Sequence, residues 1–313
     1  MEQSNGSGSK DYAYLFAFIA LSAGLNIYEL IASPPQQINF AANILPIIAI
    51  AVIIFAIFKL AEQITGSTKA GLFSAALMAP IQVYTWRAAE PLTNTLGVLF
   101  FIVSLYFFMR IKDIDWRLIL IVPVIFAFIH AYSLFLIPIY IIYVGIIKLK
   151  RKEVSQNELK LILTSTACIL GIFLLFKITP AAIFLFGHYT NYFAISSAPR
   201  VYKSLLVFAG SLPIYIGLYG AYAGITKDKK SAILLTSAAI TIFIGFITQL
   251  VDLQLGLPYF VAIFVGLAGF AFAEIEKFLQ DSKLKSKSEL IFLAAIIVVI
   301  ALGVLHRVVF TLA

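Results

Sequence analysis

Residues 70–109 read AGLFSAALMAPIQVYTWRAAEPLTNTLGVLFFIVSLYFFM, where two long apolar stretches flank the short polar gap WRAAEP (86–91). Apolar runs of about 20 residues are long enough to cross the hydrocarbon core of a bilayer as helices. Similar runs recur along all 313 residues, of which 62% are hydrophobic and 12% charged, with a mean hydropathy of +1.00. Soluble domains carry about a quarter charged residues. The sequence therefore predicts a polytopic helical membrane protein.

The apolar runs predict an all-α membrane fold with about 11 transmembrane or part-spanning helices. The expected helices are 12–32, 42–60, 70–85, 88–109, 118–130, 131–147, 160–177, 201–224, 231–250, 257–275 and 290–310. The fifth and sixth are short, which is compatible with a shallow hairpin as well as with two full crossings. Residues 1–11 are polar and rich in Gly and Ser, and we expect a disordered tail there. We expect residues 12–313 to form a single transmembrane helical domain.

The basic residues are distributed unevenly between the two sides of this expected bundle. Alternate threading with the N-terminus inside leaves five of the 23 Lys and Arg residues outside, which are Arg87, Lys177, Arg200, Lys203 and Arg307. The runs KLKRK (148–152), KDKK (227–230) and KLKSK (283–287) then fall inside. Basic loops favour the cytoplasmic side, so we expect a multi-pass protein of the cell membrane with a cytoplasmic N-terminus. This distribution explains the formal charge of +8, and we expect no nucleic-acid partner.

Most of the 15 acidic residues, Glu158 among them, fall beside the inner bases. We expect these acids to be solvated loop or helix-end charges. The acids that fall on the outer side are Glu29, Glu90 and Asp252. The single cysteine, Cys168, excludes an intrachain disulfide and a metal cluster built on cysteines.

Glu29 and the pair Arg87 and Glu90 are the candidate site residues of the outer side. An acid such as Glu29, near the end of a spanning helix, usually faces a polar cavity or a partner, so it is a candidate catalytic base or metal ligand. Contact with interfacial water explains the position of Glu29 equally well.

Arg87 and Glu90 are three residues apart, so on a helix they share a face. Either Arg87 binds a lipid phosphate while Glu90 positions it or binds a metal, or Glu90 and Pro91 only cap the following helix.

The longest expected outer loop, residues 178–203, mixes aromatic and basic side chains. Aromatic rings with polar tips suit sugar faces and the membrane interface alike, and Arg and Lys suit phosphate. The candidate binding residues here are His188, Tyr192, Arg200 and Lys203. An amphipathic segment in the headgroup layer explains the same composition without a ligand. His130, between the two short helices, is either a phosphate contact or a structural group.

The stretch 58–110 resembles the core of the GT-C superfamily of polytopic membrane glycosyltransferases, which includes protein mannosyltransferases and oligosaccharyltransferase catalytic subunits. In that family a helix that ends in a basic residue precedes a helix rich in small residues. An outer turn with a basic residue and an acid then leads into an aromatic helix. The corresponding positions here are Lys59, 70–79, Arg87, Glu90 and 92–109.

Two later stretches resemble the same family. Residues 123–143 are similar to its short helix pair, with His130 where Lys or His is common. Residues 257–278 are similar to a late helix that often begins Arg-Tyr, and here begins Leu-Pro-Tyr without the Arg. The resemblance thus extends over about residues 40–278 and implies a GT-C-like bundle.

The resemblance implies transfer of a sugar from a polyprenyl-phosphate-linked donor to an acceptor on the extracytoplasmic face. Such a transfer needs a carboxylate that deprotonates the acceptor hydroxyl and cations near the departing phosphate. The expected base is Glu29 or Glu90, and the expected phosphate-binding group is Arg87, His130, Arg200 and Lys203. A divalent metal, Mg²⁺ or Mn²⁺, is an optional cofactor without a clear ligand set. Expected partners are membrane lipid, the polyprenyl-phosphate sugar donor and, for an accessory member, a membrane-protein partner.

Two departures from the family pattern keep other functions open. The first expected outer loop, IASPPQQINF (31–40), has no acid, whereas family members carry an Asp or paired acids there. We also expect no soluble C-terminal domain of the kind that oligosaccharyltransferase catalytic subunits carry. Both departures suit a catalytically inactive accessory subunit. The buried charges and the two short helices suit a transporter or lipid flippase.

Overall fold

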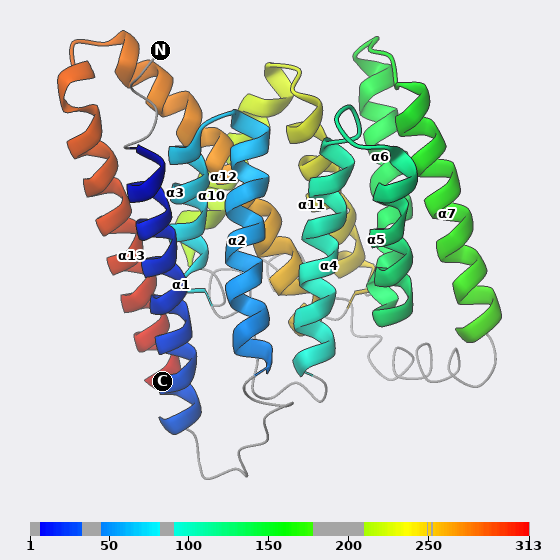
Figure 1. Ribbon diagram of the computed structural model, residues 1–313, viewed down its shortest axis with the longest axis horizontal. Coiled ribbons are helices and arrows are strands. Elements are labelled where there is room, and N and C mark those ends of the chain that lie inside the picture. Colours follow the sequence, from blue (N-terminus) through cyan, green and yellow to red (C-terminus); the bar gives the residue numbers. More distant parts are fainter. Residues whose placement is uncertain are drawn as a thin grey trace.

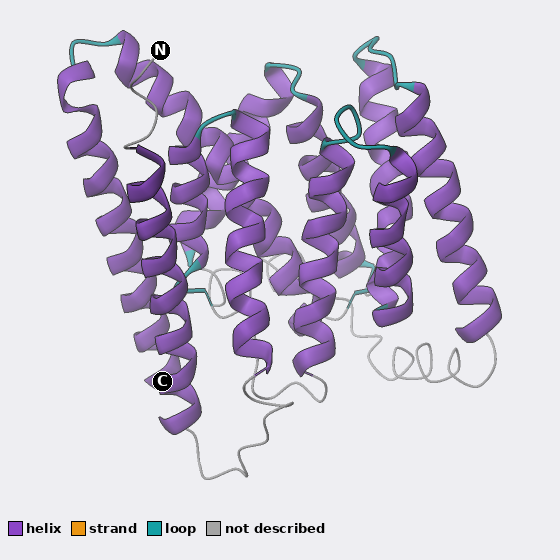
Figure 2. Cartoon of the chain, viewed as in Figure 1, coloured by secondary structure: helices purple, strands orange, loops and turns teal. Residues whose placement is uncertain are grey.

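A computed structural model describes residues 7–32, 45–81, 91–177, 210–248, 250–251 and 253–312. Every regular element in these residues is helical (Figures 1 and 2). The elements are α1 (Ser7–Ala32), α2 (Leu45–Thr65), α3 (Thr68–Met78), α4 (Pro91–Met109), α5 (Trp116–Ile129), the 3₁₀ helix η2 (Ala131–Phe135), α6 (Leu136–Leu149), α7 (Gln156–Lys177), α10 (Ser211–Thr226), α11 (Lys230–Ile247), α12 (Leu253–Asp281), the 3₁₀ helix η3 (Lys285–Lys287) and α13 (Ser288–Leu312). The all-α prediction is confirmed for this part of the chain.

Each expected helix overlaps one of these α-helices, and three boundaries differ in an informative way. Helix α1 begins at Ser7, within the expected N-terminal tail. The expected helix 70–85 ends at Met78, because Pro80 has no N–H to continue the hydrogen-bond ladder. Helix α5 ends at Ile129, where His130 adopts an extended backbone with φ −143° and ψ 136°.

Six helices in the described residues are long and apolar enough to cross a membrane. They are Leu45–Thr65, Ala131–Leu149, Gln156–Leu175, Lys230–Ile247, Gly256–Asp281 and Lys285–Arg307. Helix α5 has 14 residues and a length of about 21 Å, which is short of a hydrocarbon core of about 30 Å. The chain is therefore an integral membrane protein that combines spanning and part-spanning helices.

The turns between helices gather at two opposite ends of the bundle (Figure 1). One end, called the ion-pair end below, carries the turns 66–67, 110–115, 150–155, 227–229 and 282–287. The opposite end, called the His130 end, carries residues 79–81, 130–135 and 248–251. Helix α1 begins on the side of the ion-pair end, and α13 ends on the side of the His130 end (Figure 1). The three basic runs thus share one end of the bundle with the start of α1, as the alternate threading predicts.

Ion pairs gather at the ion-pair end, and several of them connect one turn with another. Lys69 at the start of α3 pairs with Glu276 on α12 and Glu289 on α13. Asp228 accepts from Lys150 Nζ at 2.6 Å, so the turn before α7 is tied to the turn before α11. This hydrogen bond and the charges of Lys150 and its neighbour Lys152 hold the pKa of the Asp228 carboxyl below its ordinary value. These pairs add specificity to the loop arrangement more than stability, because they are partly exposed.

Glu158 is buried, contrary to the expectation of a solvated charge, with 4% of its surface exposed. One carboxylate oxygen accepts from the Tyr143 hydroxyl at 3.0 Å, and the other from the Ser155 N–H at 2.6 Å and Lys230 Nζ at 3.1 Å. The Glu158 N–H in turn donates to Ser155 Oγ, which completes a capping box at the start of α7. The expectation was wrong for this residue because the carboxylate joins α6, α7 and α11.

Helix α12 lies in the middle of the bundle, and all its residues from 256 to 272 are buried. Helix α10 packs along it with its glycines against the α12 backbone: a Cβ at Gly217 would lie 2.6 Å from the Phe264 carbonyl oxygen. Helices α13 and α7 lie at opposite edges of the bundle (Figure 1) and expose apolar side chains such as Leu302 and Leu163. Such surfaces suit contact with lipid.

Candidate functional site

Buried or half-buried polar side chains from three separate segments lie at the His130 end. Helix α4 contributes Asn94, the turn after α5 contributes His130, Tyr132 and Ser133, and α12 contributes Tyr259. All except the half-buried His130 are buried, with exposed fractions of 6% or less. A polar group within a membrane bundle is costly unless it has a partner, and such groups usually mark functional sites. We therefore treat this set, called the His130 cluster below, as the candidate site.

His130 is held by the backbone of the turn that it begins. Its Nδ1 accepts a hydrogen bond from the Tyr132 N–H at 3.2 Å, which caps the 3₁₀ helix η2. An imidazole nitrogen that accepts a hydrogen bond carries no proton, so neutral His130 has its proton on Nε2. The ring lies 4.8 Å from the Tyr132 ring and 6.0 Å from the Tyr259 ring, measured between centroids. The hydrogen bond to the turn and the two ring contacts thus fix where the imidazole lies.

Tyr259 is fixed by aromatic neighbours and by a glycine. Its ring packs edge-on against Phe101 and Tyr132, with centroid distances of 5.4 and 5.3 Å. Its hydroxyl lies against Gly97 on α4, where an added Cβ would approach Tyr259 Oη to 2.1 Å and the His130 ring to 3.0 Å. The absence of a side chain at position 97 is thus what allows the hydroxyl to reach its place.

Three buried oxygens in the cluster have no hydrogen-bond partner among the described residues. They are Asn94 Oδ1, Ser133 Oγ and Tyr259 Oη. A buried polar group without a partner costs about 1–3 kcal/mol, so a structure that keeps several together at one end usually uses them for water or a ligand. These three oxygens are therefore candidate contacts for water or a polar ligand.

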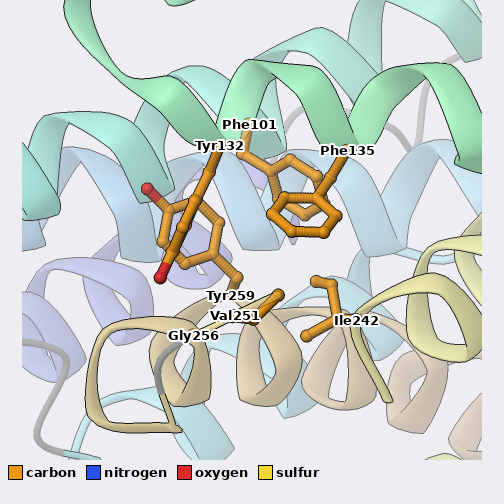
Figure 3. A pocket seen from close by; sticks show the side chains of 7 residues that line it. All are labelled: Phe101, Tyr132, Phe135, Ile242, Val251, Gly256 and Tyr259. Atoms are coloured by element: carbon orange, nitrogen blue, oxygen red, sulfur yellow. The ribbon is translucent and has the colours of Figure 1, made fainter. Parts of the chain in front are cut away.

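A small cavity adjoins the cluster and is shown in Figure 3. Its walls are Phe101, Tyr132, Phe135, Ile242, Val251, Gly256 and Tyr259. Both tyrosine hydroxyls point away from Phe135, toward one side of the cavity (Figure 3). The volume of about 10 Å³ is close to the least that one water molecule needs. The surface that lines this cavity is apolar, so the cavity itself offers no polar partner to a water molecule.

Replacing Gly97 by Ala tests whether the Tyr259 hydroxyl is held as the structure places it. We expect Gly97→Ala to lower the free energy of unfolding by about 1–3 kcal/mol, because the methyl group overlaps Tyr259 Oη and the enclosed ring cannot retreat. The measurement is the melting temperature of the protein purified in detergent. Tyr259→Phe removes the overlapping oxygen, so the double variant should melt above Gly97→Ala alone. Equal melting temperatures of the two would contradict this placement.

The structure tests the expected site residues unequally. It places His130 in the cluster, and it places position 29 in α1 without describing the Glu29 side chain. The other candidates lie outside the described residues: Arg87, Glu90, His188, Tyr192, Arg200 and Lys203. In the described part of the chain, no group of three or more His, Cys, Asp or Glu side chains can hold a metal ion. The carboxylate, metal and loop assignments therefore stay predictions.

Sequence reasoning missed Asn94, Gly97, Ser133 and Arg307. The first three are ordinary residues of apolar segments. Gly97 is notable because it lies against Tyr259 Oη, and Asn94 and Ser133 are notable because their side-chain oxygens are buried. Arg307 had a signal that was not used: it follows a long apolar run within a spanning helix, where ionised residues are costly and usually functional. Its side chain is buried, with 6% exposed.

No protein family and no curated protein matches the chain by sequence. Solved structures do match. The chain resembles the crystal structure of the apo oligosaccharyltransferase from Archaeoglobus fulgidus, with a TM-score of 0.53, 13% identity, and coverage of 84% of this chain and 44% of that one. It also resembles the oligosaccharyltransferase AglB from the same organism in complex with an inhibitory peptide and a dolichol-phosphate, with a TM-score of 0.54, 14% identity, and coverage of 93% and 47%.

These matches concern the fold. The chain spans less than half the length of the oligosaccharyltransferase chains that it matches. Over that length its helices are arranged similarly, which supports the expected GT-C-like bundle as a fold.

Proposed function

We propose that this protein transfers a sugar from a polyprenyl-phosphate-linked donor to an acceptor, at a site on the His130 end. The observation that carries the proposal is the His130 cluster, a set of buried polar groups at one end of a bundle with the oligosaccharyltransferase fold. The matched AglB structure contains a dolichol-phosphate, which supports a lipid-linked donor for this fold. We assign the His130 end to the extracytoplasmic face, since the basic runs at the other end favour the cytoplasm.

The proposed reaction exchanges one bond at the anomeric carbon of the sugar. The bond from this carbon to the phosphate oxygen of the donor breaks, and a bond to the acceptor oxygen forms. Glu29 or Glu90 takes the acceptor proton as general base, and the polyprenyl phosphate leaves as an anion. Arg87, Arg200, Lys203 and the His130 Nε2–H stabilise that charge, and His188 and Tyr192 contact the sugar.

A divalent metal, Mg²⁺ or Mn²⁺, stays an optional cofactor in this proposal. No group of three or more His, Cys, Asp or Glu side chains in the described residues can hold a metal ion, and the Glu29 and Glu90 side chains lie outside that part of the structure. The partners in this proposal are membrane lipid, the lipid-linked donor and the acceptor. A membrane-protein partner belongs to the rival function of an inactive accessory subunit.

A transfer assay on the purified protein in lipid vesicles tests the proposal. The donors are a panel of polyprenyl-phosphate sugars that differ in the sugar, and the readout is the released polyprenyl phosphate. We expect turnover with at least one donor, and a loss of about 100-fold or more in the double variant Glu29→Gln with Glu90→Gln. Glu153→Gln is the matched control, because Glu153 is an exposed acid at the opposite end.

Three outcomes would overturn the proposal. Full activity of the double carboxylate variant removes the assigned base. Faster transbilayer movement of the labelled donor, without release of polyprenyl phosphate, identifies a flippase instead. Activity that appears only when an active homologous enzyme is added identifies an accessory subunit.

A further inference from the structure

The turn after α6 carries the basic run KLKRK (148–152) on the surface of the ion-pair end. The Lys148 and Arg151 side chains are exposed, and neither forms an ion pair within the described residues. Leu149, between them, exposes 85% of its surface, which is the largest fraction among the large apolar side chains that the structure describes. The turn thus presents two unpaired cations beside an apolar side chain.

Arg151 adopts a left-handed backbone, with φ 55°. It follows the end of α6, where its N–H donates to the Lys148 carbonyl oxygen at 2.9 Å and the next N–H, of Lys152, to the Ile147 carbonyl oxygen at 3.0 Å. Helices that end with these two bonds usually have Gly at the left-handed position, because a Cβ is strained there. No hydrogen bond or ion pair of the Arg151 side chain within the described residues compensates for this strain.

Asp228, in the turn after α10, is the second described non-glycine residue with a positive φ, of 57°. Its carboxylate accepts from Lys150 Nζ at 2.6 Å and lies 3.5 Å from Lys152 Nζ. Asp228 therefore has a role inside the protein, since it ties the two turns together and brings the exposed Lys229 to the same surface. Strained positions without such a role often serve a ligand, and Arg151 is one of them.

Both turns lie at the level where lipid headgroups begin. Three candidate spans end or begin at these turns, which are Ala131–Leu149, Gln156–Leu175 and Lys230–Ile247. Leu149 ends the first span, so its exposed side chain lies at the border of the hydrocarbon core. Long basic side chains at this border extend toward the headgroup phosphates. A lipid would cover Leu149 with its acyl chains, whereas a soluble acidic partner would leave it uncovered or pay to dehydrate it against polar groups.

We propose that Lys148, Arg151 and Lys229 bind the phosphate of an anionic phospholipid, with Leu149 against its acyl chains. Glu153 is the exposed acid of the turn after α6, and the three cations exceed its charge. The Arg151 guanidinium offers paired hydrogen bonds to phosphate oxygens, which explains an arginine at a strained position. The site lies at the opposite end of the bundle from the His130 cluster, and it does not depend on the proposed function.

Native mass spectrometry of the whole protein in a neutral detergent measures binding at the tightest lipid site. Dioleoylphosphatidylglycerol should bind in preference to dioleoylphosphatidylcholine, and glycerol phosphate, which lacks acyl chains, should not bind measurably. One basic residue near a lipid surface is worth about fivefold in affinity. Arg151→Gln should therefore weaken phosphatidylglycerol binding about fivefold, and the triple variant with Lys148→Gln and Lys229→Gln about 100-fold. Lys285→Gln, an exposed lysine in η3 at the same end, is the matched control and should change nothing.

Melting temperatures separate the lipid contact from the backbone strain. Arg151→Gly relieves the left-handed position, so in detergent alone it should melt about 2 °C above the parent. Phosphatidylglycerol should raise the melting temperature of the parent by mass action, and Arg151→Gly should lose most of this rise. Arg151→Lys keeps the charge and should keep most of the rise. A gain without lipid combined with a loss with lipid is a result that a purely structural arginine cannot produce.

The proposal fails if the parent binds the two phospholipids equally well, or if the triple variant binds phosphatidylglycerol as tightly as the parent. It also fails if Arg151→Gly keeps the full lipid effect, because the guanidinium then does not contact the phosphate. A peptide of ten glutamates that binds more tightly than phosphatidylglycerol, with the same dependence on Arg151, would identify a soluble acidic partner in place of the lipid. Tight binding of glycerol phosphate would identify a site for free phosphate compounds instead.

Discussion

Glu158→Ala is expected to destabilise the protein by about 3 kcal/mol, although the residue lies at the opposite end from the candidate site. Removal of the carboxylate leaves the buried Tyr143 hydroxyl without its acceptor and takes the anion from Lys230. It also removes one half of the capping box at the start of α7. A broken buried ion pair costs about 3–5 kcal/mol, and the expected loss is at the lower end of this range because Lys230 is partly exposed.

The measurement is the free energy of unfolding in mixed micelles, or the apparent melting temperature where unfolding is irreversible. Glu153→Ala is the matched control, because it removes an exposed acid five residues earlier and should change stability by no more than about 0.5 kcal/mol. Glu158→Gln keeps the size and part of the hydrogen bonding, so it should fall between the two. If Glu158→Ala melted at the same temperature as Glu153→Ala, the Glu158 carboxylate would not join α6, α7 and α11 as described.

Gly220→Ala is the second large effect that the structure predicts. Helix α10 approaches α12 so closely that a Cβ at Gly220 would lie 1.9 Å from the Leu267 carbonyl oxygen. A methyl group there meets backbone, which cannot rotate away as a flexible side chain can. The two helices have to separate, and contacts along their whole length loosen. We expect a loss of about 3 kcal/mol or more, at the upper end of the cost of overpacking.

Gly145→Ala separates this packing effect from the general effect of the substitution. Gly145 is exposed within α6, and an added Cβ would meet nothing within 4 Å. Ala is the better helix former by up to about 1 kcal/mol, so this variant should be as stable as the parent or more stable. Melting temperatures and the yield of monodisperse protein after extraction compare the two variants. A Gly220→Ala protein that behaved like Gly145→Ala would refute the close approach of α10 to α12.

Much of the fold was predictable from sequence because hydropathy is a local property. The apolar runs predicted each α-helix of the described residues, and the basic runs predicted which turns share an end. The errors have local causes as well. Helix α3 ends before the predicted residue 85 because of Pro80, which lies within the apolar run that predicted the longer helix. The capping box of Ser155 and Glu158 is visible in the sequence as Ser-x-x-Glu, and it indicates a structural role for Glu158.

The candidate site was predictable to a smaller degree. His130 was singled out as a polar residue between two apolar helices, and the structure places it in the cluster. Asn94, Gly97 and Ser133 carry no such contrast with their neighbours. They matter because α4 and α12 bring Gly97 and the Tyr259 hydroxyl into contact, and no local pattern encodes that meeting.

The sequence alone determined that this is a helical membrane protein, where its helices lie, and which of their ends carry the positive charge. These properties follow from the free energy of transferring each short segment from water to lipid. Only the tertiary structure decided that Glu158 is buried, that Tyr259 Oη rests on Gly97, and that Arg307 reaches Asn26 across 281 positions of the chain. Such contacts depend on how each helix is rotated and how closely it approaches its neighbours. Close backbone packing at residues such as Gly220 sets both.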